Sequence, residues 1–163
     1  MAKLSTEKYL YYYGITFNLN YVALRYSNVY GPRQDPYGEA GVVAIFSNLV
    51  KNNKAVIVNG SGNNTRDYIY IDDIVEANIR AMKSKKGKAA YNIATEKETS
   101  VNEIVKMLKE ISQKNIIVKH GPTKSEQKKT RLSARKAKKE LVWQARVDFF
   151  TGLKKTYEWF KQN

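Results

Sequence analysis

Two stretches of the 163-residue sequence combine residue types that could bind an anionic ligand. The first, Leu24 to Arg33 (LRYSNVYGPR), begins at the end of a β-prone run, Tyr21 to Leu24, and continues into polar and turn-forming residues. The second, Thr65 to Asp73 (TRDYIYIDD), contains Arg66, whose guanidinium could hold a phosphate through two parallel hydrogen bonds. A surface ion pair of Arg66 with Asp67 or Asp72 accounts for the same residues at least as well. The residue types alone leave the choice open.

The hydrophobic pattern supplies the elements that would position these residues, and it predicts an α/β domain. The β-prone run that ends at Leu24 reads as a buried strand, and open α/β sheets bind ligands just beyond the carboxyl ends of such strands. Gly14 is expected to end the first helix, and Asp72 or Asp73 to cap the third. Helices are expected over residues 2–13, 42–50, 74–82, 100–111 and 149–160, and strands over 21–24, 55–58, 66–71, 89–94 and 116–118.

Composition excludes several kinds of site. The sequence has no cysteine and a single histidine, which excludes disulfides, thiolate metal sites and a histidine metal cluster, so no metal is expected. No stretch approaches the roughly 18 apolar residues of a membrane span. No signal-peptide pattern follows Met1, and the expected location is the cytoplasm. With 42% hydrophobic residues, the chain suits one domain with a real core.

The net charge of +14 makes nucleic acid, or another polyanion, an alternative partner. Much of the positive charge lies between Lys114 and Lys139, where the segment KSEQKKTRLSARKAKKE is typical of a solvated helix face and its approach loop. No zinc-finger spacing, helix-turn-helix signature or aromatic RNA-binding pattern accompanies it. The sequence therefore favours a solvated surface over a nucleic-acid site.

Four separated segments resemble, in order, the carboxyl-terminal half of nucleotide-sugar epimerases and dehydratases of the extended short-chain dehydrogenase/reductase family. They are LRYSNVYGPRQDPYGEAGVVAIF, VIVNGSGNNTRDYIYIDDIVEAN, YNIATEKETSVNEI and KAKKELVWQARVDFFTGLKKTYEWF. The segment GEAGVVAIF is most similar to the UDP-glucose 4-epimerase branch. The resemblance implies part of an NAD(P)-binding Rossmann-like fold. Residues 1–33 would be a remnant of the Rossmann domain and residues 34–163 mainly the substrate-binding domain, with residues 66–94 returning to the Rossmann sheet.

The resemblance also implies roles for individual residues. Lys3 matches the lysine of the family's Tyr-x-x-x-Lys pair, a catalytic residue that also binds the nicotinamide ribose of NAD. Tyr26 falls in the loop beside the nicotinamide. For the UDP-sugar substrate, the implied contacts are Asn28 and Arg66 to the diphosphate, Val42 and Val43 along the cleft, Val58 to the base, and Lys124 as a second diphosphate cation.

Several family features are missing from this sequence. The glycines nowhere form the Gly-x-x-Gly-x-x-Gly phosphate loop. The tyrosine that pairs with Lys3 would lie before Met1. Val142 stands where the family usually has glycine before tryptophan, and Ser133 stands where it has a capping aspartate. We therefore expect part of a nucleotide-sugar site that neither turns over substrate nor binds NAD alone.

The resemblance leaves two alternatives for the partner and two for the substrate. The chain would form a homodimer through the helix over residues 2–13, or it would pair with a complementing amino-terminal half. The substrate would be UDP-glucose or UDP-galactose, interconverted through a 4-keto sugar while NAD carries the hydride. A dTDP-glucose 4,6-dehydratase or another UDP-sugar epimerase is the alternative within the family.

Overall fold

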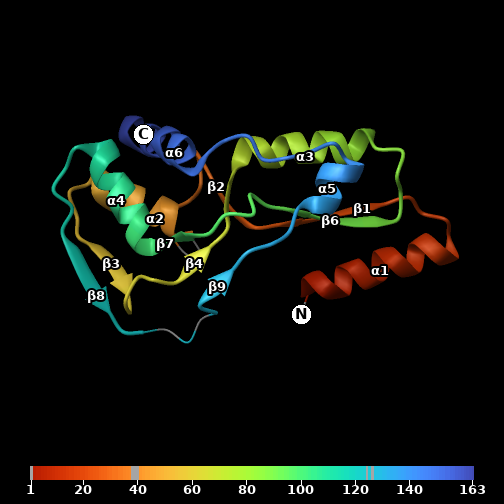
Figure 1. The fold of residues 1–163 in the computed structure, drawn as a ribbon, viewed down its shortest axis with the longest axis horizontal. Coiled ribbons are helices and arrows are strands. Elements are labelled where there is room, and N and C mark those ends of the chain that lie inside the picture. The colour runs from red at the N-terminus through yellow and green to blue at the C-terminus, as the bar shows by residue number, and fades with distance from the viewer. Residues whose placement is uncertain (1, 38–40, 124, 126) are drawn as a thin grey trace.

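The computed structural model describes residues 2–37, 41–123, 125 and 127–163 as alternating helices and strands (Figure 1). This confirms the predicted α/β class. The helices are α1 (Ala2–Thr16), α2 (Val42–Lys51), α3 (Ile71–Lys83), α4 (Val101–Ser112), α5 (Arg135–Glu140) and α6 (Phe149–Gln162). The strands are β1 (Val22–Tyr26), β2 (Asn28–Tyr30), β3 (Val56–Asn59), β4 (Thr65–Arg66), β5 (Tyr68–Tyr70), β6 (Ala89–Ile93), β7 (Thr99–Ser100), β8 (Val118–Gly121) and β9 (Lys129–Thr130).

Most strand pairing is parallel, as expected when helices connect successive strands. β1 pairs with β6, β2 with β5, and β3 with β8, all in parallel. β4 lies between β7, to which it is antiparallel, and β9, to which it is parallel. All three residues of β5 are buried, which is the pattern of a strand covered on both faces.

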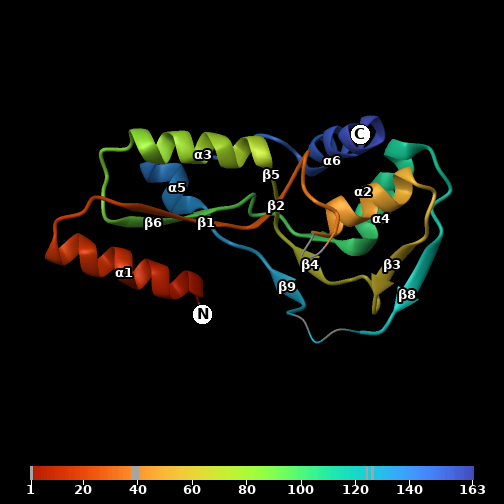
Figure 2. The ribbon, with the colours of Figure 1, turned by 180° about the vertical axis from the view of Figure 1, so that it is seen from behind.

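The elements gather into two groups along the long axis of the molecule. Figures 1 and 2 show α2, α4, α6, β3 and β8 at one end, and α1, α3, α5, β1 and β6 at the other. Each end has its own hydrophobic cluster. In the cluster near β6, Trp143 is 1% exposed and its indole nitrogen donates to the Asp73 carbonyl oxygen at 3.0 Å. The division into domains at residue 33 stays a prediction.

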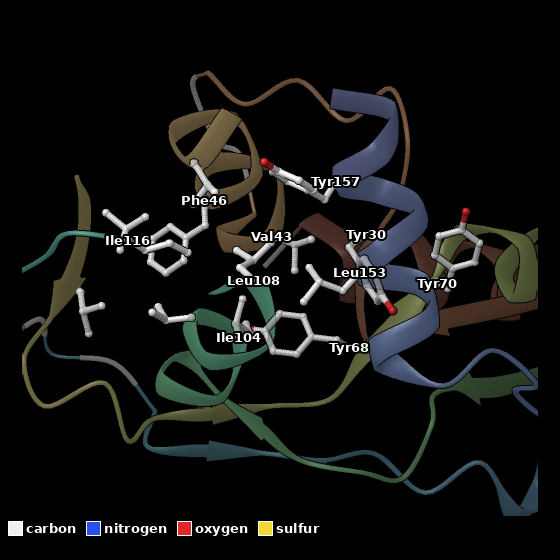
Figure 3. Packing of buried hydrophobic residues seen from close by; sticks show 14 residues of the cluster. Tyr30, Val43, Phe46, Tyr68, Tyr70, Ile104, Leu108, Ile116, Leu153 and Tyr157 are labelled. Carbon is white, nitrogen blue, oxygen red and sulfur yellow. The ribbon is translucent and has the colours of Figure 1, made fainter. Parts of the chain in front are cut away.

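The other cluster supports the region in which the predicted ligand contacts lie. Figure 3 shows side chains of α2, α4 and α6 converging near Tyr30 and Tyr68, which belong to β2 and β5. The Tyr30 hydroxyl donates to the Phe149 carbonyl oxygen at 3.3 Å, and burial raises the pKa of Tyr30 well above its ordinary value. A Cβ atom on Gly152 would lie 2.3 Å from the Tyr30 hydroxyl oxygen, so only glycine permits this contact.

Local signals located most elements but misplaced some of their ends. The helix expected to open at Thr99 or Ser100 is capped by Ser100: Ser100 Oγ accepts from the Glu103 amide at 3.2 Å, and Glu103 Oε2 accepts from the Ser100 amide at 2.6 Å. The Ser100 amide and hydroxyl both donate to the Glu103 carboxylate, and these hydrogen bonds lower its pKa. Gly14, however, does not end α1, which continues to Thr16. Gly14 instead permits close packing, since a Cβ there would lie 2.9 Å from the Tyr21 ring.

Two further expectations about strands were wrong. Residues 28–30, expected to be loop, form β2 because they find a parallel partner in β5. Residues 66–71, expected to be one strand, are interrupted at Asp67, and Ile71 already belongs to α3. Asp67 is 1% exposed and its carboxylate accepts hydrogen bonds from Thr95 and Glu96, so the chain turns around a buried acceptor.

The expected cap of α3 was also wrong. The residue at the cap position is Tyr70, whose side chain forms no capping hydrogen bond. The Asp73 carboxylate lies within the helix and accepts from the backbone amides of Arg146 and Val147 at 3.0 and 3.1 Å. It therefore holds the segment after Trp143 against α3, a long-range role that helix-start statistics do not reveal.

Replacing Val142 with glycine should stabilise the protein. Val142 has φ +52°, so a β-branched residue occupies the left-handed region, which is strained for it. The residue is 75% exposed, so packing of the side chain offsets little of that strain. Relief of that strain exceeds the added chain entropy of glycine, for a net gain of about 1 kcal/mol. Urea unfolding measures the gain. Val142→Ala, which keeps the Cβ atom, should gain less, and a loss of stability in Val142→Gly would contradict the strain argument.

Candidate functional site

A cavity of about 700 Å³ lies between the β2–α2 segment and the strands β3 and β4. Asn28 and Arg66 line it, as do Val42 and Val43 at the start of α2. The structure thus brings together four residues that the sequence analysis assigned to one substrate. Further walls come from Ile57 and Asn59 of β3, from the turn after it (Gly60, Ser61, Gly62 and Asn64), and from Gln34, Thr123 and Lys128.

The turn between β3 and β4 depends on glycine. Gly60 and Gly62 have φ +63° and +72°, and a Cβ atom on Gly62 would lie 2.2 Å from Asn102 Oδ1. The Asn102 amide group donates to the Ser61 carbonyl oxygen at 3.0 Å and to Asn63 Oδ1 at 3.0 Å. The first turn of α4 therefore fixes the shape of this wall of the cavity.

Asn28 is held at the carboxyl-terminal edge of β1, where β2 begins. Its backbone amide and its side-chain Nδ2 both donate to the Asp67 carbonyl oxygen, at 2.9 and 3.0 Å. Asp67 in turn uses its carboxylate to hold Thr95 and Glu96. The surface ion pair of Arg66 with Asp67 is thereby corrected, because Asp67 is buried and its oxygens accept from backbone and hydroxyl groups.

Arg66 sits in the middle strand of the β7–β4–β9 sheet and is partly buried. Its Nη1 atom donates to the carbonyl oxygens of Thr65, at 2.9 Å, and Gln127, at 2.6 Å. These contacts orient the guanidinium plane at the cavity edge. Among the described lining residues, Arg66 and Lys128 are charged and none is acidic. The cavity therefore suits an anionic ligand that also has an apolar or ring portion to contact α2.

The structure places the other predicted site residues elsewhere. Val58 is 0% exposed and does not line the cavity, because strand alternation turns its neighbours Ile57 and Asn59 outward instead. Lys3 is exposed on α1. The Tyr26 hydroxyl donates to Asn78 Oδ1 at 3.0 Å and lines a separate hollow of about 470 Å³ along β1 and α3. Lys124 lies outside the described residues.

Sequence reasoning missed several polar residues of the cavity wall. Asn59 and Asn64 flank the glycine turn, and Gln34 follows the GPR segment. Their position beside turn residues at strand ends is the signal that could have identified them. Lys128 gave no such signal, because it lies within a run of basic residues.

The described part of the chain also bears on two other kinds of feature, a cluster of metal ligands and a membrane-spanning helix. It contains no group of three or more histidine, cysteine, aspartate or glutamate side chains that could hold a metal ion. The ring of His120 instead forms a hydrogen bond through Nδ1 with the Gly60 carbonyl oxygen at 2.8 Å. Within the same described residues, no helix has the length and apolarity needed to span a bilayer.

Comparison with known proteins finds a matching family model and relatives that align with nearly the whole chain. Residues 1–94 match the model of the NAD dependent epimerase/dehydratase family. The UDP-glucose 4-epimerase of Mycolicibacterium smegmatis is 36% identical over 161 residues, 98% of this chain and 51% of that protein. The dTDP-D-glucose 4,6-dehydratase of Homo sapiens is 31% identical over 173 residues, 99% of this chain and 47% of that protein.

A solved structure has the same fold over nearly the whole chain. The crystal structure of the Thermotoga maritima UDP-glucose 4-epimerase, determined with UDP-glucose, has a TM-score of 0.92 and 45% identity. The match covers 99% of this chain and 52% of that one. The chain therefore spans about half the length of the relatives that it matches.

Proposed function

The chain belongs to the NAD dependent epimerase/dehydratase family, and from that membership we propose that it is the substrate-binding half of a UDP-glucose 4-epimerase-like enzyme. The observation that carries the proposal is the cavity in which Asn28 and Arg66 lie beside the apolar start of α2. A UDP-sugar has a doubly charged diphosphate between two ring systems, and this cavity combines cationic, amide and apolar groups in one volume.

In the proposed complex, the chain's own residues bind and orient the substrate. Arg66 would hold the diphosphate through its guanidinium, which the Thr65 and Gln127 carbonyl oxygens orient. Asn28 would contribute an amide group to the same diphosphate. Val42 and Val43 would exclude water along one side of the ligand. Val58 would act only indirectly, by supporting the strand whose outward residues line the cavity.

The residues implied for NAD account for only one end of the dinucleotide. The resemblance assigns Lys3 and Tyr26 to the nicotinamide and its ribose, but the sequence contains no glycine-rich phosphate loop for the rest of NAD. When NAD is bound in a complete enzyme, it supplies the hydride acceptor. We propose that holding NAD requires a complementing amino-terminal half, so that this chain alone does not turn over substrate. The cytoplasm is its proposed location.

Two other functions make different predictions. A dTDP-sugar dehydratase half is supported by the 31% identity to the human enzyme, and it would prefer a thymine nucleotide. A polyanion-binding protein is supported by the net charge of +14, and its binding would fall steeply with salt whatever the nucleotide. Nucleotide preference distinguishes the dehydratase half from the proposed epimerase half, and the salt dependence of binding distinguishes the polyanion-binding protein.

Calorimetric titration of the chain with UDP, UDP-glucose and UDP-galactose tests the proposal. At about 0.15 M salt the Debye length is about 8 Å, so remote surface lysines contribute little. All three ligands should bind, and dTDP should bind more weakly. Tighter binding of dTDP would favour the dehydratase, while binding only to duplex DNA or heparin would favour the polyanion function. If no heat of binding were detected with any of these ligands, the proposal that the chain is a substrate-binding half would be contradicted.

The partner is tested by reconstitution. Mixing the chain with an amino-terminal half that carries the tyrosine and the phosphate loop, together with NAD, should produce UDP-glucose 4-epimerase activity that neither half shows alone.

Self-association through α1 is the competing proposal, supported by the exposure of Tyr9, Tyr11 and Tyr12 on that helix. Sedimentation of the chain alone would show it as a dimer that Tyr9→Ser and Tyr12→Ser convert to a monomer.

A further inference from the structure

The backbone before β9 is attached to the strand that carries Arg66. The Thr65 amide donates to the Lys128 carbonyl oxygen at 2.9 Å, and Arg66 Nη1 donates to the Gln127 carbonyl oxygen at 2.6 Å. Arg66 lies opposite Thr130 in the parallel β4–β9 register. Figures 1 and 2 both show β9 beside β4. These contacts fix the Lys128 backbone at the cavity edge, although 62 residues separate it from Arg66 in the sequence.

Neighbouring lysines on this segment have different surroundings. Lys128, at the bend just before β9, lines the cavity, whereas Lys129, the first residue of β9, does not. Both side chains are exposed. Among the described lining residues, Lys128 is the charged residue that accompanies Arg66, and no carboxylate lies with them. The structure therefore separates one lysine from a basic run that otherwise looks uniform.

We propose that Lys128 is a second cationic binding residue for the diphosphate of a nucleoside-diphosphate sugar, and that it acts together with Arg66 in the same cavity. The inference rests on the proposed function, and it gives the second diphosphate cation, which the resemblance implied at Lys124, to a residue that the sequence analysis placed in a solvated basic segment. A diphosphate group that joins two ester oxygens carries two negative charges. Arg66 matches the geometry of one phosphate with its planar fork, and the flexible ammonium of Lys128 matches the charge of the other.

The two cations are coupled through the backbone. Arg66 holds the Gln127 carbonyl oxygen, and the Thr65 amide holds that of Lys128, so removal of the guanidinium also loosens the segment that positions the lysine. Losses of affinity in Arg66→Ala and Lys128→Ala should therefore not add. The double variant should bind UDP more tightly than the product of the two single effects predicts.

Lys128→Ala and its matched control Lys129→Ala test the inference. Both variants remove one exposed lysine of the same segment, so net charge and long-range attraction change equally. Titrated with UDP, Lys128→Ala should lose about tenfold in affinity, the size of one charge-assisted hydrogen bond in a partly solvated site. Lys129→Ala should change by less than about twofold. Uridine, which lacks the phosphates, should bind both variants and the parent chain alike, and Lys128→Arg should restore most of the UDP affinity.

Each other outcome has a defined meaning. If the parent chain binds UDP and Lys128→Ala binds it equally well, the inference is overturned while the proposed function stands. Equal losses in both variants would also overturn it, because charge alone would then explain the effect. If the parent chain binds UDP no better than inorganic phosphate, the proposed function fails and the inference fails with it. An unchanged thermal midpoint in Lys128→Ala distinguishes lost ligand contact from lost folding.

Discussion

Arg66→Ala should weaken UDP binding by about a hundredfold, equivalent to roughly 2.7 kcal/mol. The change removes the guanidinium that would bind the diphosphate, and it also removes the hydrogen bonds to Thr65 and Gln127 that shape the cavity edge. Calorimetric titration at moderate salt measures the loss directly. A variant that retained the affinity of the parent chain would show that the diphosphate binds elsewhere.

Matched variants separate the chemistry of Arg66 from its charge and from folding. Arg66→Lys keeps the positive charge but loses the planar fork, so it should bind UDP with intermediate affinity. Lys138→Ala and Lys139→Ala remove exposed charges on α5, away from the cavity wall, and should leave UDP affinity within about twofold. The polyanion function predicts the opposite order, with the α5 lysines more important than Arg66. A far-UV spectrum and thermal midpoint close to those of the parent chain would confirm that Arg66→Ala folds.

Asp73→Asn should lower the free energy of unfolding by about 3 kcal/mol, because a buried charged acceptor loses one of its two backbone donors. Asp73 is 5% exposed, and its two oxygens accept from the Arg146 and Val147 amides. Asparagine keeps one acceptor but turns an NH₂ group toward the second amide. For a chain of this size the midpoint of thermal unfolding should fall by about 8 °C, and urea unfolding should give the corresponding free energy.

Asp72→Asn is the matched control for this change. Asp72 precedes Asp73 in the first turn of α3 but is exposed, so its replacement removes only the favourable interaction of a carboxylate with the helix amino terminus. The expected cost is about 0.5 kcal/mol. If the two variants were equally stable, the buried hydrogen bonds of Asp73 would not be what fastens the Trp143 segment to α3.

Local patterns in the sequence determined much of the fold. Hydrophobic periodicity located the helices later seen as α2, α3, α4 and α6, because a buried helix face repeats with the helix itself. The cap at Ser100 was also readable, since it joins residues only three positions apart. Motif order identified the family and placed Asn28, Val42, Val43 and Arg66 in a common site, and the cavity contains all four.

Contacts between distant segments were decided only by the tertiary structure. Asp73 looked like a helix cap because the amides that it binds lie more than 70 residues later. Val58 was assigned as a ligand contact from the family resemblance, and the sequence does not say which face of a short apolar strand is covered. Lys128 and Lys129 looked equivalent because neither charge nor hydropathy distinguishes them, and only the pairing of β9 with β4 directs one of them to the cavity. The sequence alone determined most of the helices and the family to which the chain belongs, since hydrophobic periodicity, caps and motifs are local signals. The tertiary structure decided which further side chains line the site and which expected ones do not, because burial and strand pairing depend on residues far apart in the chain.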